Sequence, residues 1–216
     1  MKTDAQLKKD VETELEWDPA VAAAGIGVEV KGGIVTLTGH LESYPEKIAA
    51  EKAAQRVAGV KGVAVEIDVK LPGSSYRTDA DIAAYATDAI RWNTSVPQER
   101  IKIKVEGGRV TLSGDVDWNY QRTSAESTVR DLIGVKGVLN QIQLKQKISP
   151  ENVKAKIEAA LQRAAHLDAK AIKVEILGGT VTLEGSVHSL AERRLIENAT
   201  WAAPGVLKVV DGIRIA

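Results

Sequence analysis

Several residue types that carry common protein chemistry are missing or scarce in this sequence of 216 residues. Cysteine and phenylalanine are absent, and methionine occurs once. Without cysteine the chain has no disulfide, no thiol nucleophile and no cysteine-ligated metal. Positive and negative side chains balance at 29 each, so no net charge attracts nucleic acid. These absences exclude thiol enzymes, disulfide scaffolds and a general nucleic-acid-binding protein.

Long apolar segments are missing as well. No run approaches the roughly 18 apolar residues of a membrane-spanning helix. The N-terminal stretch MKTDAQLKKDVETELEW is charged and lacks the apolar core of a secretory signal. We therefore expect a cytoplasmic protein, or a periplasmic one if a signal precedes this sequence.

The histidines and glycine pairs form no catalytic or metal-binding motif. His40, His166 and His188 do not have the spacing of a metal site. A phosphate-binding loop leads into a helix, whereas the Gly-Gly pairs here lead into predicted strands. Neither a Gly-x-Ser-x-Gly nor a Gly-Lys-Ser/Thr motif occurs. We predict a non-enzyme with no catalytic residues, no cofactor and no metal.

One pattern is present three times. Residues 26–39, 101–114 and 172–185 each alternate apolar and polar residues around a Gly-Gly pair. The period of two predicts two strands with one buried face, and the glycines supply the positive φ angles of a tight hairpin turn. The copies lie 75 and 71 residues apart along the chain. We infer a triplicated unit.

Glycines recur at the same offsets in all three copies. Two form each hairpin turn, one closes the second strand, and one ends the second helix, where it fits a left-handed C-cap. The predicted structural turn glycines are Gly32, Gly33, Gly39, Gly59, Gly107, Gly108, Gly114, Gly134, Gly178, Gly179, Gly185 and Gly205.

Each copy is predicted to fold as an α-β-β-α-β unit, which makes the chain an α+β protein. The three-stranded sheet of each unit should carry two helices packed on one face. Second helices are expected near 45–58, 121–133 and 191–203, and last strands near 63–69, 138–144 and 209–215. The predicted domains are residues 1–71, 78–147 and 148–216.

Matching residues mark the start of each first helix. Thr3, Thr78 and Ser149 are expected to act as N-caps. Gln6 and Asp81 follow the first two caps by three residues, as in a capping box. The inward faces are predicted from apolar residues at intervals of four: Leu7, Val11 and Leu15; Ile82, Ala86 and Ile90; Val153, Ile157 and Leu161.

The order of these motifs resembles the BON domain, a family named after bacterial osmotically inducible and nodulation proteins. The shared features include the Gly-Gly hairpin, the glycine that closes the second strand, and Gly-Val-x-x-Val before the last strand, as at 59–63 and 134–138. The third copy departs from them at Leu207-Lys208, where the others have Lys-Gly. The resemblance implies phospholipid binding or envelope support under stress; some cytoplasmic relatives bind a small cation.

Differences between the copies indicate where a specific function would reside, because the fold explains what they share. In the second copy Arg100, Lys102 and Lys104 alternate with apolar residues, so three cations should project from one strand face, and Arg109 follows the turn. Residues 72–147 carry 11 basic and 9 acidic side chains, net +2. This pattern favours contact with anionic phospholipid. A solvated face whose lysines deter strand pairing is the alternative.

The second copy also carries an aromatic segment between its hairpin and second helix. Trp118, Tyr120 and Arg122 suit a membrane interface, and we predict that they contact lipid. A hydrophobic staple at the helix start, or contact with a neighbouring repeat, is the alternative. Asp115 and Asp117 would disfavour an anionic membrane and could suit a cation.

Three further aromatic residues are candidates for contacts between repeats or between subunits. Trp201 occupies the position of Gln55 and Arg130 in the other copies, where a polar side chain is expected. Tyr85 and Trp92 lie two turns apart on one helix, where extension of the local core is the first interpretation and packing between repeats the second.

These inferences predict a non-catalytic binding or scaffold protein of the bacterial osmotic and envelope stress response. Weak peripheral binding to an anionic phospholipid surface is the leading mechanism. There are two alternatives. One is a cytoplasmic sensor that binds a small cation, and the other is a self-assembling scaffold that forms a homo-oligomer.

Overall fold

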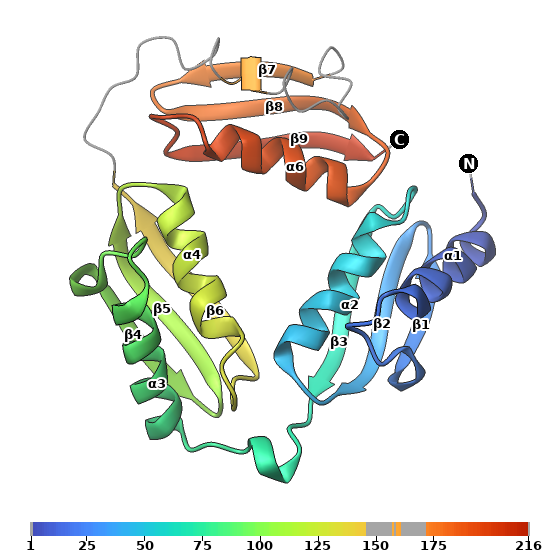
Figure 1. Ribbon diagram of the computed structural model, residues 1–216. Coiled ribbons are helices and arrows are strands. Elements are labelled where there is room, and N and C mark those ends of the chain that lie inside the picture. The colour runs from blue at the N-terminus through green and yellow to red at the C-terminus, as the bar shows by residue number, and fades with distance from the viewer. Residues whose placement is uncertain (1, 146–156, 158, 161–171, 216) are drawn as a thin grey trace. The chain divides into compact units, whose positions relative to one another are not determined.

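The computed structural model describes residues 2–145, 157, 159–160 and 172–215 (Figure 1). These residues form three separate three-stranded sheets, one in each copy of the pattern, named repeats 1, 2 and 3 in chain order. The predicted α+β fold of repeated units is confirmed. The predicted N-cap Ser149, His166 and, except for residues 157, 159 and 160, the first helix of repeat 3 lie outside the described residues.

The elements follow the predicted order. Repeat 1 contains α1 (Asp4–Trp17), β1 (Ile26–Lys31), β2 (Ile34–Leu41), α2 (Tyr44–Arg56) and β3 (Gly62–Val69). Repeat 2 contains α3 (Asp79–Trp92), β4 (Ile101–Glu106), β5 (Arg109–Val116), α4 (Asn119–Arg130) and β6 (Gly137–Leu144). The described part of repeat 3 includes β7 (Ile172–Leu177), β8 (Thr180–Val187), α6 (Leu190–Trp201) and β9 (Lys208–Ile215). Three short 3-10 turns are η1 (Ala23–Gly25), η2 (Gly73–Ser75) and η3 (Gln98–Arg100).

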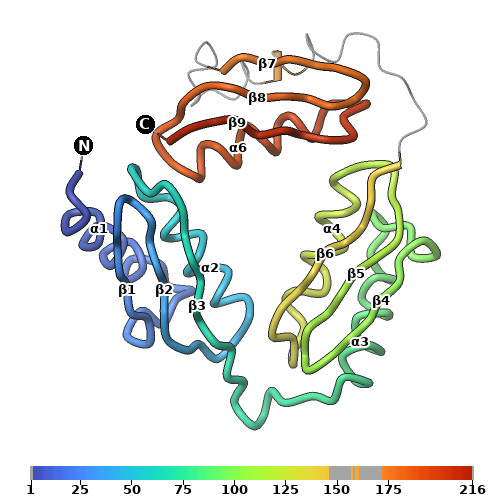
Figure 2. The backbone as a smooth tube through the Cα atoms, turned by 180° about the vertical axis from the view of Figure 1, so that it is seen from behind, coloured from blue at the N-terminus to red at the C-terminus, as the bar shows by residue number. Residues whose placement is uncertain are grey.

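The second strand lies at the centre of each sheet. It pairs antiparallel with the first strand and, in repeats 2 and 3, parallel with the third. In repeat 2, α3 and α4 lie on one side of the sheet and leave the other side without a helix (Figures 1 and 2). The start of β4, the end of β5 and the end of β6 therefore meet at one end of this sheet.

Repeat 2 has a continuous apolar core between its helices and sheet. The predicted inward face of α3, formed by Ile82, Ala86 and Ile90, is buried as expected. The other buried members of this core are Val96, Val110, Leu112, Val116, Ala125, Val129, Val135 and Ile142. Because both helices bury their apolar faces against the same side of the sheet, polar side chains on the opposite side stay in water.

The first helices of repeats 1 and 2 begin with the predicted capping boxes. The Thr3 hydroxyl accepts the N–H of Gln6, and the Gln6 side chain accepts the N–H of Thr3. Thr78 and Asp81 make the same reciprocal pair at 3.2 and 3.1 Å. The short aspartate side chain therefore reaches as far as the glutamine does.

The residue after each of these caps ties the helix to the hairpin. The Asp4 carboxylate accepts the N–H groups of Gly32 and Gly33 at 2.8 and 3.1 Å. In repeat 2 the carboxylate of Asp79 accepts the N–H groups of Gly107 and Gly108, both at 2.8 Å. The matching residue in repeat 3 is Pro150, which has no carboxylate. The aspartate that makes this contact is therefore not repeated at the matching position of repeat 3.

All twelve predicted turn glycines have positive φ angles. The strictest requirement is at the glycine that closes the second strand. A Cβ atom on Gly114 would lie 1.9 Å from the carbonyl oxygen of Arg100, and one on Gly39 would lie 2.1 Å from that of Gly25. At φ of +125° in both cases, no other residue fits without moving the backbone.

The second helices differ from the prediction at both ends. They begin at Tyr44, Asn119 and Leu190, so Tyr120 lies in the first turn of α4 rather than in the preceding segment. They end at Arg56, Arg130 and Trp201, and a short turn separates each end from the positive-φ glycine. The predicted C-cap position of this glycine is therefore wrong, because its positive φ angle belongs to the turn that follows the helix and not to the helix end.

The Leu207-Lys208 departure in repeat 3 leaves the final turn unchanged. The N–H of Leu207 donates to the carbonyl of Gly179 at 2.8 Å, as that of Lys136 does to Gly108. In repeat 1 a Cβ on Gly62 would lie 3.1 Å from the Ile34 side chain. Repeat 3 has the shorter Thr180 at the position of Ile34, which leaves room for the side chain of Lys208.

Candidate functional site

The helix-free side of the repeat 2 sheet carries the predicted basic side chains. Exposure alternates along β4, so that Lys102 and Lys104 point to water while Ile101, Ile103 and Val105 face the core. Arg109, the first residue of β5, is also exposed. We call Lys102, Lys104 and Arg109 the basic face of repeat 2.

Arg100 differs from these three cations because it lies just before β4, in η3, and is already paired. Its guanidinium donates to Asp115 and to Asp117, the latter at 3.0 Å. The nearby Lys145 also approaches Asp115, at 3.6 Å. The sequence predicted three equivalent cations on one strand, whereas the positive charge of Arg100 is neutralised by the end of β5.

The same contact decides what Asp115 and Asp117 can bind. The hydrogen bond from Arg100 holds the pKa of Asp115 below its ordinary value, so the carboxylate is charged at neutral pH. Both carboxylates already have a cationic partner, and a metal ion would have to displace it. Within residues 2–145 and 172–215, no group of three His, Cys, Asp or Glu side chains has the arrangement of a metal site.

The remaining cations differ in how far their charge is compensated. Lys104 pairs with Glu106 at 2.9 Å, and both side chains are well exposed. Lys102 and Arg109 have no ion-pair partner among the described residues. An exposed pair such as Lys104–Glu106 is weak and exchanges readily with other partners. The basic face therefore offers its charge to an external anion chiefly through Lys102 and Arg109.

Trp118 stands where the other repeats cap their second helix. Ser43 and Ser189 occupy the matching positions, and their hydroxyls accept the N–H groups of Glu46 and Glu192. Trp118 has no side-chain acceptor for this purpose, although the Gln121 side chain accepts the N–H of Trp118. Because Trp118 is itself the N-cap, it does not occupy the position of a hydrophobic staple, which precedes the cap.

The other two candidates of this segment lie in α4. Tyr120 is 58% exposed, whereas Arg122 is half-buried. The helix that carries them covers the face of the sheet opposite to the basic face. The structure therefore does not bring the basic and aromatic candidates onto one surface.

Tyr85 and Trp92 are more exposed than their interpretation as core residues requires. Tyr85 is 55% and Trp92 is 84% exposed on α3. The expectation that they extend the local core is wrong, because Ile82, Ala86 and Ile90 already fill the inward face. Trp17, at the position of Trp92 in repeat 1, is likewise exposed.

Trp201 contacts its own repeat. Its side chain is half-buried against the core of repeat 3, which includes Ile196 and Ala203. Its indole N–H points to Glu197 at 3.5 Å. Packing within the repeat therefore explains part of the burial of the Trp201 side chain.

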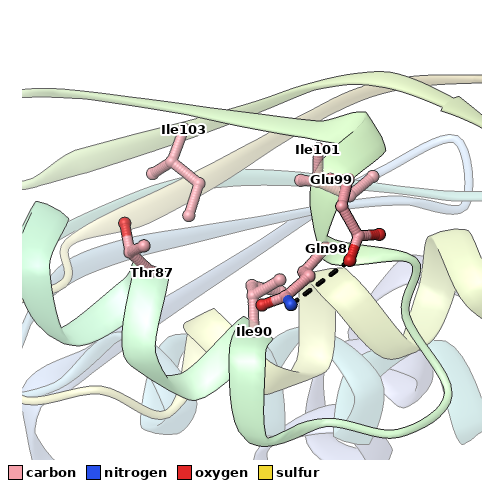
Figure 3. A pocket seen from close by; sticks show the side chains of 6 residues that line it. All are labelled: Thr87, Ile90, Gln98, Glu99, Ile101 and Ile103. Atoms are coloured by element: carbon pink, nitrogen blue, oxygen red, sulfur yellow. Dashed lines mark hydrogen bonds between the residues drawn. The ribbon is translucent and has the colours of Figure 1, made fainter.

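An open pocket of about 320 Å³ lies between α3 and the start of β4 (Figure 3). Its lining residues are Thr87, Ile90, Gln98, Glu99, Ile101 and Ile103. Glu99 is the one ionisable side chain among them, and it accepts a hydrogen bond from Gln98 at 3.3 Å. A catalytic site requires several convergent ionisable or nucleophilic groups, which this lining does not provide.

Two structural features were not predicted from the sequence although a signal was present. Thr-Asp occurs at 3–4 and 78–79, and the aspartate in each binds the glycine turn. Ser43 and Ser189 share a register with Trp118, which would have identified Trp118 as a replaced helix cap.

No helix in the described part of the chain is long and apolar enough to cross a membrane.

Comparison with known proteins identifies the repeated unit. The chain is 30% identical over 146 residues to osmotically-inducible protein Y of Escherichia coli (strain K12), covering 66% of this chain and 73% of that protein. It is 28% identical over 122 residues to an uncharacterised protein of Anaplasma centrale, covering 53% and 81%.

Among solved structures, the chain matches CdsD, a structural protein of the type III secretion system of Chlamydia trachomatis. The identity is 13%, the match covers 98% of this chain and 92% of that one, and the TM-score of 0.27 supports no further argument. The family model of the BON domain matches residues 3–70, 78–146 and 149–216. The chain therefore belongs to the BON domain family.

Proposed function

We propose that this chain is a non-catalytic binding protein of the bacterial osmotic stress response, which attaches peripherally to anionic phospholipid through repeat 2. Family membership and the similarity to an osmotically inducible protein support the link to stress. The attachment is weak and reversible, because each basic residue close to an anionic membrane contributes about 1 kcal/mol.

The observation that carries this proposal is the basic face itself. Lys102, Lys104 and Arg109 occupy a helix-free sheet surface in repeat 2. Repeat 1 has Gly27, Glu29 and Ile34 at the matching positions, and repeat 3 has Lys173, Glu175 and Thr180. Since the three folds are alike, the fold does not require cations there. A surface of this kind attracts anionic headgroups and should lose affinity as salt rises.

Vesicle co-sedimentation tests the proposal. The chain is mixed with neutral or anionic phosphatidylcholine–phosphatidylglycerol vesicles at low and high salt. We expect binding that requires anionic lipid, weakens with salt and is strongly reduced in Lys102→Glu/Lys104→Glu. Lys9→Glu/Lys52→Glu is the matched control, because it makes the same change in net charge at exposed residues of repeat 1. Equal loss in both variants, or no binding by the unmodified chain, would refute the proposal.

A second candidate function is self-assembly or scaffolding, and the exposure of Tyr85 and Trp92 favours it. Large aromatic side chains left in water on a helix commonly mark an interaction surface. A concentration-dependent mass that becomes constant in Tyr85→Ser/Trp92→Lys would support this role. A monomeric mass at all concentrations, with unchanged vesicle binding in that variant, would leave the basic face as the functional surface.

A further inference from the structure

Repeat 3 exposes apolar side chains near its hairpin turn, and at two of these positions the other repeats carry charge. Leu177, at the end of β7, is 85% exposed, and Leu207 and Val210 are 40% and 41% exposed. Repeats 1 and 2 have Lys31 and Glu106 in place of Leu177, and Lys61 and Lys136 in place of Leu207. We call Leu177, Leu207 and Val210 the turn surface of repeat 3.

The strand register places these side chains at one end of the repeat 3 sheet. Leu177 is paired with Thr180 across the Gly178-Gly179 turn. The backbone N–H of Leu207 donates to Gly179, and its side chain lies beside that glycine. Val210 is exposed on β9, where it pairs with Thr182. The two leucines therefore flank the hairpin turn, and Val210 lies on the same exposed sheet face as Leu177.

The fold does not require leucine at these positions. The Lys61 and Lys136 stems pack against Gly33 and Gly108 as Leu207 packs against Gly179. In each case the nearest side-chain atom lies 3.1–3.2 Å from the point that a Cβ on the glycine would occupy. A lysine stem thus fills the same space in the other repeats while its ammonium group reaches water. Leucine at this position gives up the charge without a gain in packing within the repeat.

The size and charge of the turn surface favour a lipid surface as its occupant. Three partly exposed aliphatic side chains offer roughly 200–300 Å², against about 800 Å² per partner in a standard protein interface. Lys208, next to Leu207, is exposed and has no ion-pair partner among the described residues. Leucine beside an unpaired lysine matches the boundary between acyl chains and anionic headgroups.

We infer that the turn surface of repeat 3 is a second lipid-contact site, at which Leu177 and Leu207 enter an anionic phospholipid surface. This inference rests on the proposed function of the chain, but it concerns a different repeat and a different force. The basic face of repeat 2 acts through charge, which salt screens, whereas insertion of leucine persists at high salt.

The test replaces each leucine by the residue that repeat 1 carries. Leu177→Lys/Leu207→Lys is compatible with the fold and adds positive charge, so electrostatics alone would strengthen binding to anionic vesicles. We expect the opposite, a roughly tenfold or larger loss of vesicle partitioning at high salt. Leu195→Lys is the control, because Leu195 is exposed on α6 in the same repeat, away from the turn.

A local probe separates the inference from the proposed function. The chain has no cysteine, so Leu177→Cys and Leu195→Cys can each carry a single environment-sensitive fluorophore. We expect a blue shift with anionic vesicles at 177 and none at 195. If the chain binds vesicles without a shift at 177, this inference fails and the repeat 2 site stands. If the unmodified chain binds no vesicle, both fail. If Leu177→Lys/Leu207→Lys changes the mass of the chain but not vesicle binding, a second copy is the occupant and the inference is overturned.

Discussion

Replacing Asp79 tests the contact between the first helix and the glycine turn. Its carboxylate accepts the N–H groups of Gly107 and Gly108, each at 2.8 Å. Hydrogen bonds to a charged group contribute about 1.5–3 kcal/mol each, and less where water competes, so this exposed pair should contribute about 2 kcal/mol in total. The negative charge also lies in the first turn of α3, which favours it by a few tenths of a kcal/mol. We expect Asp79→Ala to destabilise repeat 2 by about 2 kcal/mol.

Native-state hydrogen exchange of the full chain provides the assay, because it reports the opening of each repeat separately. Core amides of repeat 2 should exchange faster in Asp79→Ala, while those of repeat 3 serve as the internal standard. Asp79→Asn keeps one acceptor oxygen and should lose about half as much. Asp88→Ala removes an exposed carboxylate on the same helix whose partner is Arg91, and should change the free energy of opening by less than about 0.5 kcal/mol.

Equal exchange in Asp79→Ala and Asp88→Ala would refute a stabilising role of the glycine-turn contact. Equal destabilisation of repeat 3 would refute it too, because the Asp79 contact lies within repeat 2. A uniform loss across all three repeats would mean that the effect is transmitted through the chain and does not arise from the glycine turn.

Three further outcomes follow from the geometry of repeat 2. Gly114→Ala should lower the free energy of unfolding of repeat 2 by about 3 kcal/mol or more, because its Cβ would lie 1.9 Å from a carbonyl oxygen. Gly107→Ala, whose Cβ would have nothing within 4 Å, should lower it by about 1 kcal/mol, and hydrogen exchange compares the two variants. Arg100→Gln should raise the pKa of Asp115 towards its ordinary value in an NMR titration. Since the native pKa is lowered, the Arg100–Asp115 pair stabilises the fold above about pH 4, and this stabilisation is lost as the pH falls through the native pKa. Trp118→Ser removes the aromatic side chain and should therefore weaken vesicle binding. It also restores a helix cap worth about 1 kcal/mol, so the unfolding temperature should change by no more than about 3 °C; a larger fall would assign Trp118 to the fold.

The sequence predicted the elements that depend on local pattern. The glycine turns, both described capping boxes and the inward face of α3 follow from residues within one or two turns of each other. The triplication follows from the repetition of the same local pattern along the chain. The ends of the second helices were misplaced by up to three residues, because a turn intervenes before each glycine. Asp79 escaped prediction since its partners lie 28 and 29 residues away.

The charge pattern on β4 illustrates why a candidate site is harder to predict than a fold. Alternation correctly placed Lys102 and Lys104 on one exposed face. It could not show that Arg100 is paired, because Asp115 and Asp117 meet it through the strand register, 15 and 17 residues away. Helical spacing likewise put Tyr85 and Trp92 on one flank of α3 without deciding whether that flank is covered.

Comparison of the three repeats also ranks the remaining lipid-contact candidates. Arg122 has a basic counterpart in each of the other repeats, and both counterparts serve the fold. Lys47 donates to the backbone carbonyl of Ile67 in the third strand, and Arg193 pairs with Asp211 in β9. A cation at this position is therefore explained by the shared architecture, and Arg122 is the weakest of the predicted contacts.

Lys104 and Arg109 have no basic counterpart in either of the other repeats, and Lys102 has one, Lys173, which is paired with Glu175 and Glu184. The fold leaves unexplained the unpaired charge of Lys102 and Arg109 in repeat 2, and lipid binding would account for it.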